Sequence, residues 1–310
     1  MSRVVVLTGG VGGAKLALGL TALLGGDRIT AIVNTGDDFS HLGLAISPDI
    51  DTLLYTLSGK SDEVKGWGRA GESWSFMDAL RSLAGEDWFQ LGDGDLALHV
   101  LRTAARARGD SLSAVTAAFA KAWRVEATML PMTDDPIATM IDTDEGLLPF
   151  QTYFVARRCE PRVRGIRFDG AAAARPAPGV LEALADPAVT AIVIAPSNPW
   201  LSVDPILAVP GIREALRAAT APVVALSPIR NGEAFKGPTA KIMGELGLTV
   251  DSATIAAHYS DFLDGMIVDS ADDLAVEGLT VARTDIAMPT LARKKELAAE
   301  VLAMASRLRA

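Results

Sequence analysis

The sequence has few of the residues that build disulfides and transition-metal sites. Cys159 is the single cysteine among 310 residues, and the three histidines, His41, His99 and His258, lie far apart along the chain. One cysteine cannot form an internal disulfide, and scattered histidines do not make a zinc ligand set. Oxygen ligands, which suit hard cations such as Mg²⁺, remain as the metal chemistry that this chain can offer.

Positive net charge and long apolar runs are also missing. The 29 Lys and Arg residues are outnumbered by 38 Asp and Glu, which gives a formal net charge of -9. This balance argues against a general nucleic-acid surface, so an anionic ligand must be met by local groups. Because no run approaches the roughly 20 apolar residues of a membrane helix and no secretory h-region opens the chain, we expect a cytoplasmic protein without membrane contact.

Apolar β-branched runs alternate with helical patterns. Such runs occur at "RVVV" from Arg3, at "ITAIVN" ending with Asn34, and at residues 191–196 and 221–228. They predict an α/β fold with a doubly wound, mostly parallel, Rossmann-like sheet built from residues 1–46 and 186–310.

Residues 47–185 predict an inserted substrate lobe. The stretch from Ser47 to Lys121 has mainly helical periodicity, and a small β-rich piece follows, with strands expected in residues 150–158 and 161–170. An amphipathic helix over residues 290–310 is expected to pack on the core.

The glycine-rich stretch at residues 7–19, "LTGGVGGAKLALG", stands between the first strand and a helix. The first turn of a helix after such a loop favours an anion. A Walker A loop is excluded because Leu16, not Ser or Thr, follows Lys15, and a dinucleotide loop is disfavoured because Lys15 replaces the third glycine and the second strand ends in Asn34. A tight turn without a ligand is the alternative, but Lys15 favours a phosphate.

Acidic residues follow the second strand in two groups. Asp37 and Asp38 come shortly after Asn34, and Asp49 and Asp51 fall in the first turn of a helix predicted to begin at Pro48. One carboxylate is enough to cap a helix, and adjacent acids can also form a simple turn. The surplus of negative charge without Cys or His nearby favours a Mg²⁺ site that bridges to substrate phosphates.

A third acidic stretch and two later loops complete the pattern. Asp93 and Asp95 begin a helix that carries His99, for which a capping pair and a solvated histidine are the simpler interpretation. Ser197 and Asn198 follow one later strand, and Arg230, Lys236 and Lys241 follow the next. Since the carboxyl ends of parallel strands share one edge, these loops and the glycine loop could together hold a nucleotide diphosphate.

Taken in order, several segments resemble one family. They are "TGGVGGAK", "NTGDD", "SPDIDT", "LGDGDLALH", "FQTYFV", "PSNPWLSVDPIL" and "SPI…KGPTAK". This set is similar to the 2-phospho-L-lactate transferases (CofD, called FbiA in actinobacteria) of coenzyme F-420 biosynthesis. The resemblance implies that residues 1–310 form a single CofD-like unit. It also implies Mg²⁺-dependent transfer of a 2-phospholactyl, phosphoenolpyruvyl or 3-phosphoglyceryl group from a guanosine-diphosphate-linked donor to the deazaflavin Fo, with release of GMP.

The resemblance, together with the residue patterns, assigns roles to individual positions. Asp37 and Asp51 are the expected catalytic acids, and Asp37 and Asp49 the expected metal ligands. The donor is expected to bind Gly10, Gly12, Gly13, Lys15, Ser197, Asn198 and Lys236, and the acceptor Asp51, Thr52, Asp93 and His99. One departure concerns Gly94, because the family usually reads Gly-Asp-Arg-Asp where this chain has Gly-Asp-Gly-Asp at residues 92–95. A cation expected near the ligands is therefore missing at that position.

Two other functions remain as alternatives. The first is a non-catalytic nucleotide-sugar-binding regulator of the same superfamily, which would share the glycine loop and the Asp-Asp pair but would not need "SPDIDT" and the lobe after it. The second is an NAD-dependent oxidoreductase, which Lys15 and Asn34 disfavour. Apolar helix faces left exposed would make the protein a homodimer.

Overall fold

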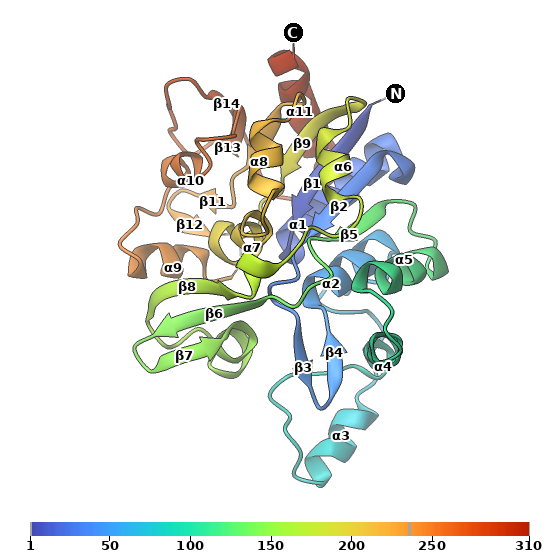
Figure 1. Ribbon diagram of the computed structural model, residues 1–310. Helices are drawn as coiled ribbons and strands as arrows, with labels where there is room; N and C mark the ends of the chain where they lie inside the picture. The colour runs from blue at the N-terminus through green and yellow to red at the C-terminus, as the bar shows by residue number, and fades with distance from the viewer. Residues whose placement is uncertain (1, 235–236, 310) are drawn as a thin grey trace.

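A seven-stranded parallel sheet organises the chain (Figure 1). The computed structural model describes residues 2–234 and 237–309. The strands are β1 (Arg3–Thr8), β2 (Ile29–Val33), β5 (Thr128–Pro131), β9 (Val189–Ile194), β10 (Val223–Leu226), β13 (Gly265–Asp269) and β14 (Thr280–Thr284). They lie in the order β14-β13-β10-β9-β1-β2-β5, and every neighbouring pair is parallel. The predicted doubly wound α/β fold is confirmed.

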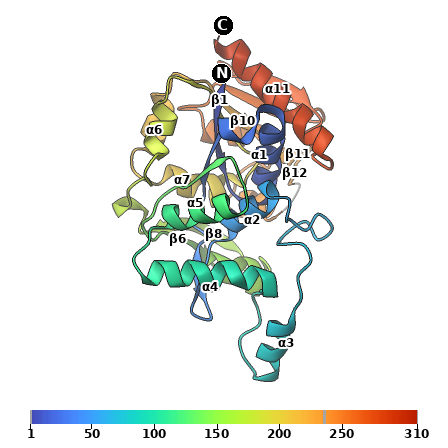
Figure 2. The same cartoon turned by 90° about the vertical axis from the view of Figure 1, so that its right-hand side faces the viewer.

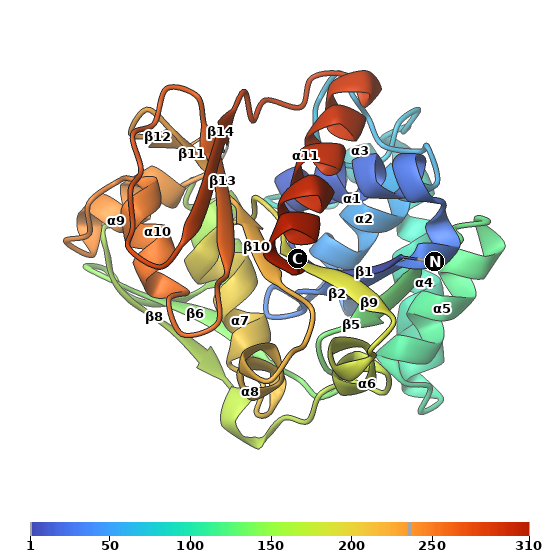
Figure 3. The ribbon, with the colours of Figure 1, turned by 90° about the horizontal axis from the view of Figure 1, so that it is seen from above.

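Alternate residues of the central strands enter two separate cores. On β1, Val4 and Val6 pack in the core formed with α1 (Gly10–Leu24), α2 (Pro48–Leu57) and α11 (Leu291–Arg309). Val5 and Leu7 pack in the opposite core, which holds α6 (Val180–Ala185), α7 (Asp204–Leu207), α8 (Ile212–Arg217) and α10 (Ser252–His258). Figure 3 shows α1 and α11 on one face of the sheet and α6 and α8 on the other. Continuous apolar strands thus reflect burial on both faces.

The strand order reverses between β1 and β9. From β1 the chain builds outward to β2 and β5, whereas β9, β10, β13 and β14 extend the sheet in the other direction. In open parallel sheets, ligands bind beyond the carboxyl ends of the strands at such a reversal. The loops that follow β1 and β9 are therefore the natural walls of a site.

Smaller elements gather beyond this carboxyl edge (Figure 1). An antiparallel sheet has the order β7-β6-β8, from β6 (Ala138–Thr143), β7 (Gly146–Pro149) and β8 (Val163–Asp169). A hairpin joins β3 (Phe39–His41) and β4 (Leu44–Ile46), and a second short hairpin joins β11 (Ile229–Arg230) and β12 (Glu233–Ala234), before α9 (Thr239–Glu245). Three helices, α3 (Ser75–Ser82), α4 (Asp93–Ala107) and α5 (Leu112–Ala122), complete the lobe, and Figure 2 shows α4 crossing below α5 with α3 farther from the sheet.

The structure differs from the sequence predictions in three places, of which the first is His99, expected to be solvated but buried at 1% exposure. β5 falls inside the range 47–185 predicted for the inserted lobe, yet it pairs with β2 as an edge strand of the main sheet. The strand predicted over residues 150–158 is wrong, because Thr152–Ala156 forms a π-helical turn. Phe150 and Tyr153 are both buried in the core of the small sheet, and this spacing of three residues suits a helical turn rather than a strand. The predicted helices beginning at Pro48 and Asp93 and at the carboxyl terminus are confirmed.

Membrane-spanning helices are not found in the described parts of the chain, since none of their helices combines the necessary length and apolarity.

Candidate active site

The loops after β1 and β9 are joined by Ser197. Its hydroxyl accepts a hydrogen bond from the Gly9 N–H (3.1 Å) and donates one to the Gly9 carbonyl (2.7 Å). A Cβ on Gly12 would lie 2.6 Å from the Pro196 carbonyl oxygen, and one on Gly13 would lie 2.7 Å from Ser197 Oγ. These glycines therefore allow the first turn of α1 to pack directly against the loop after β9.

Asp49 meets the amino end of α1. Its Oδ1 accepts a hydrogen bond from the Gly10 N–H at 2.7 Å, and its Oδ2 accepts one from Asn34 Nδ2 at 3.0 Å. Asn34 in turn accepts a hydrogen bond from the Gly36 N–H through Oδ1 at 2.8 Å. The helix amino terminus, where the sequence predicts a phosphate, thus already holds one carboxylate of the protein itself. Lys15 is half-buried on the same helix.

Asp37 and Asp38 lie in the turn between β2 and β3. Burial raises the pKa of both carboxyls well above the ordinary value, and the neighbouring carboxyl of Asp49 raises both further. Asn34 and Thr139 act against this effect at Asp37, as Ser47 does at Asp38, where its hydroxyl donates to Oδ2 at 2.6 Å. Within the described structure, Oδ1 of each of these two aspartates is buried without a hydrogen-bond partner.

Burial also raises the pKa of Asp49, to about 6. Buried carboxyls with unpartnered oxygens are stable only when protonated or paired with a cation. Asp37 has such an oxygen, whereas both oxygens of the buried Asp49 accept hydrogen bonds, and two neighbouring carboxyls are the kind of ligand that a divalent cation prefers. Which residues bind a metal remains a prediction.

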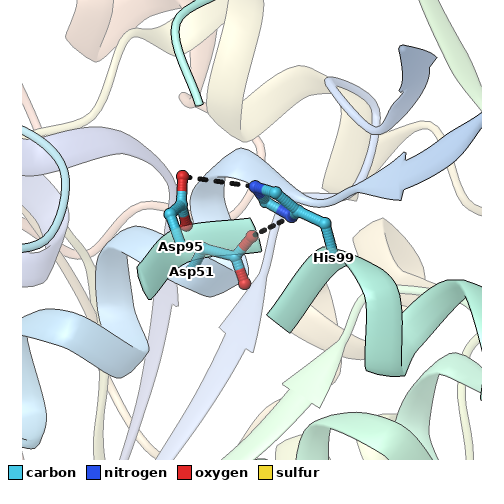
Figure 4. A group of neighbouring side chains, drawn as sticks. All are labelled: Asp51, Asp95 and His99. Atoms are coloured by element: carbon cyan, nitrogen blue, oxygen red, sulfur yellow. Dashed lines mark ion pairs between the residues drawn. The ribbon is translucent and has the colours of Figure 1, made fainter. Parts of the chain in front are cut away.

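A second group joins α2 to α4 (Figure 4). His99 places Nε2 3.2 Å from Asp95 Oδ2 and Nδ1 3.7 Å from Asp51 Oδ2. The ligand atoms of these three side chains lie within 4.8 Å of one another, so that the group could hold a metal ion. Tyr55 donates its hydroxyl hydrogen to Asp95 Oδ1.

Arg102 already supplies a cation to this second group. Its guanidinium donates to both carboxylate oxygens of Asp51, through Nη1 at 3.1 Å and through Nη2, and Nη1 also donates to His99 Nδ1 at 3.3 Å. His99 thus lies between the guanidinium of Arg102 and the carboxylate of Asp95. A metal here would have to displace the guanidinium, whereas Asp37 has a free oxygen.

The other residues predicted to bind the acceptor have different surroundings. Asp93 accepts hydrogen bonds from the Ser73 hydroxyl (2.7 Å) and from the backbone N–H groups of Ser75 (3.1 Å) and Phe76 (3.0 Å), so its carboxylate caps α3. These contacts lower the pKa of Asp93, the Ser73 hydrogen bond most strongly. Thr52 is half-buried on α2 beside Asp51. The structure thus joins Asp51 with His99, and it gives Asp93 a partner in α3.

The space beside Gly94 is filled by Arg69. A Cβ on Gly94 would lie 2.7 Å from the guanidinium carbon of Arg69 and 2.9 Å from Glu72 Oε1. Arg69 forms an ion pair with Glu72 at 2.9 Å, and Glu72 accepts a hydrogen bond from the Gly94 N–H at 2.6 Å. The guanidinium of Arg69, from a neighbouring loop, therefore occupies the space that a side chain at position 94 would fill.

The polar side chains after β9 and β10 differ in whether they have hydrogen-bond partners. Asn198 Oδ1 accepts hydrogen bonds from the N–H groups of Trp200 (3.0 Å) and Leu201 (3.1 Å), while its Nδ2 is buried with no partner in the described chain. Lys241 donates to Glu245 Oε2 at 2.7 Å and to the Pro161 carbonyl at 2.9 Å. Lys236, predicted to bind the donor, lies outside the described residues.

Sequence reasoning missed Arg102 and Tyr55. Both follow a predicted site residue by one helical turn, since Arg102 is three residues after His99 and Tyr55 four residues after Asp51. Helical spacing from the acids could have identified them.

Comparison with known proteins agrees with this architecture. A family model described as 2-phospho-L-lactate transferase CofD matches residues 4–304. The chain is 42% identical to a phosphoenolpyruvate transferase from Kitasatospora aureofaciens, with 99% of each chain covered. It is 38% identical to a 2-phospho-L-lactate transferase from Methanosarcina mazei, over 95% of this chain and 97% of that one.

Among solved structures, a UPF0052 family protein from Bacillus halodurans superimposes with a TM-score of 0.64, over 97% of this chain and all of the other, at 20% identity. That likeness concerns the fold alone. With nearly its whole length matched by the family model and by relatives near 40% identity, the chain belongs to the CofD family of 2-phospho-L-lactate transferases.

Proposed function

We propose that the protein transfers a phosphoenolpyruvyl group from a guanosine-diphosphate-linked donor to the ribityl hydroxyl of Fo, with release of GMP, in coenzyme F-420 biosynthesis. The observation that carries this proposal is the 42% identity, over 99% of both chains, to a phosphoenolpyruvate transferase. The relative that carries a 2-phospholactate name is 38% identical. The choice among three-carbon acids is therefore part of the test.

Mg²⁺ would be held by Asp37 and Asp49. Asp49 is fixed by the Gly10 N–H and by Asn34, while Asp37 offers an unpartnered oxygen. When bound, the ion would neutralise charge on the diphosphate oxygens during transfer. The two carboxyls would be ionised in that state, because a cation favours the charged form.

The chain's own groups would position the two substrates. The donor would lie along the glycine loop and the loop after β9, where the Asn198 amide is available as a donor group. Asp51 has both oxygens occupied by Arg102, so we propose that it positions Arg102 and His99 beside the acceptor and does not take a proton itself. Group transfer of this kind depends chiefly on positioning and charge neutralisation.

We propose that the donor and the acceptor bind to different parts of the fold. Residues 1–46 and 186–310 would form the donor side. The small sheet and helices α3 to α5 would form the acceptor side together with Asp51 on α2, while β5, α2 and α6 pack in the main sheet and its two cores. The homodimer and the cytoplasmic location stay predictions.

Purified protein, Fo and Mg²⁺ should be incubated separately with each of the three guanosine-linked donors, and the products followed by mass spectrometry. We expect a phosphoenolpyruvyl adduct of Fo with GMP, and no product when a chelator removes the metal. Asp37→Asn should abolish turnover, whereas Asp78→Asn, which changes an exposed acid on α3, should leave it intact. Product from the phospholactyl donor alone would correct the donor, and no product from any donor would refute the transferase.

A further inference from the structure

Thr139 joins the small sheet to the acidic site. It lies on β6, and its backbone N–H donates a hydrogen bond to the Gly36 carbonyl at 2.7 Å. A Cβ on Gly36 would lie 2.7 Å from Thr139 Oγ1, so the hydroxyl rests against the backbone directly before Asp37. Gly36 thus permits a close approach between β6 and the turn after β2.

The Thr139 hydroxyl is buried without a partner. The residue is 2% exposed, and Oγ1 makes no hydrogen bond within residues 2–234 and 237–309. Thr35 Oγ1 and Asp37 Oδ1, one residue to either side of Gly36, are also buried and unpartnered there. Native proteins rarely leave buried polar atoms unsatisfied, so we expect these three oxygens to pair with one another or with a bound ion.

The two carboxylates of the proposed cation site differ in their support. Asp49 has one hydrogen bond on each oxygen, from Gly10 and from Asn34, which fixes its orientation. Asp37 has no such bond on Oδ1. Carboxylates that bind metal ions are normally held by hydrogen bonds from surrounding groups, and losing one of these weakens metal affinity.

We propose that Thr139 is a positioning residue of the divalent-cation site, whose hydroxyl donates a hydrogen bond to Asp37 Oδ1 and directs that carboxylate at the ion. This inference rests on the proposed metal assignment. It gives the small antiparallel sheet a role in the site, because β6 supplies a group beside Asp37 in addition to those of the main sheet.

Mg²⁺ alone, titrated into metal-free protein by calorimetry, tests the proposal, with thermal unfolding as a second readout. Thr139→Val keeps the shape of the side chain and removes the hydroxyl. We expect it to weaken Mg²⁺ binding roughly 10-fold. Its metal-free melting temperature should fall only slightly, since the net contribution of one hydrogen bond to stability is small. Thr139→Ser should bind Mg²⁺ like the wild type.

Thr116 provides a matched control. It lies on α5, is 1% exposed, and likewise has a hydroxyl with no partner in the described structure. Thr116→Val should leave Mg²⁺ affinity unchanged. If Thr139→Val binds Mg²⁺ with wild-type affinity, the role of Thr139 is refuted while the metal assignment stands. The same holds if the variant melts at a lower temperature without metal but keeps its Mg²⁺ affinity. Absence of Mg²⁺ binding by the wild type would overturn it together with the metal assignment, while the transfer assay judges the reaction separately.

Discussion

The guanidinium of Arg102 on α4 clasps the carboxylate of Asp51 on α2, and both residues are almost completely buried, at 1% and 4% exposure. Arg102 Nη1 also donates to the Ala45 carbonyl at 3.2 Å, in the hairpin strand β4. One side chain therefore links the helical lobe, the hairpin and a helix of the main core.

Asp51→Asn should destabilise the protein, because it leaves the Arg102 charge buried and uncompensated. Breaking a buried ion pair from one side costs about 3–5 kcal/mol. Urea denaturation should show this loss, while Arg81→Gln, which breaks exposed ion pairs with Asp78 and Asp87, should change stability by at most about 0.5 kcal/mol. Wild-type stability with lost turnover would instead mean that Asp51 acts directly on a substrate.

Metal-free protein should lose stability as the pH rises from about 4 to about 6. Burial raises the pKa of Asp49 to about 6 from the ordinary 3.8, so the folded protein keeps a proton that the unfolded chain has released. The free energy of unfolding then falls across this window, by about 3 kcal/mol for a shift of this size. Asp37 acts in the same direction.

The measurement is chemical denaturation in chelator at several pH values, with Asp49→Asn as the comparison. The variant should show a shallower decline because position 49 no longer titrates. Mg²⁺ should stabilise the wild type more above pH 6 than below it, since the ion binds the ionised carboxylates. A flat stability profile in the wild type would show that these carboxyls are ionised without a metal.

Asp93→Ala should loosen α3 and leave the main sheet intact. The carboxylate satisfies two backbone N–H groups at the amino end of α3, and alanine cannot replace either bond. Hydrogen exchange should become faster across Ser75–Ser82, with unchanged protection in β1 and β9. Asp78→Ala, in the same helix but exposed, serves as the control. Unchanged exchange with a raised KM for Fo would favour the acceptor-binding role predicted from the sequence.

Gly12→Ala should be costly, and Gly244→Ala should not. A Cβ at Gly12 would meet the backbone carbonyl of Pro196 at 2.6 Å, and the loop after β9 would have to move. Overpacking of this kind destabilises by about 1–3 kcal/mol. Gly244 on α9 has open space, so alanine there should stabilise by up to about 1 kcal/mol through helix propensity. Equal melting temperatures for the two variants would contradict this account of the glycine loop.

The sequence was sufficient to predict the main sheet, the helices at Pro48 and Asp93, and a concentration of acids beyond the second strand. These features follow from local periodicity and from the geometry of parallel sheets. The place of β5 did not follow, because a short edge strand beyond a long helical segment carries no sign of its partner. The π-helical turn after β7 was also missed, since Phe150 and Tyr153 are buried by tertiary packing against the small sheet.

Within the candidate site, the sequence indicated which acids gather at the carboxyl edge of the sheet but not how they pair. Asp37, Asp49 and Asp51 are the same residue type in the sequence. Only the three-dimensional contacts show that Asp37 Oδ1 has no partner in the described structure and that Asp51 is held by Arg102. Thr139 shows the same limit, because it is distant in the chain from Asp37 and reaches it through the docking of a separate sheet.

Arg69 and Gly94 share one volume, and this has a consequence for the evolution of the site. The guanidinium of Arg69 occupies that space while position 94 lacks a side chain, and a side chain at position 94 would require the guanidinium to shift. In relatives, the two positions should therefore covary, with a large residue at one accompanied by a small residue at the other. The positive charge of this part of the lobe would then be conserved by the two positions together. A comparison of relatives at position 69 or 94 alone would miss it.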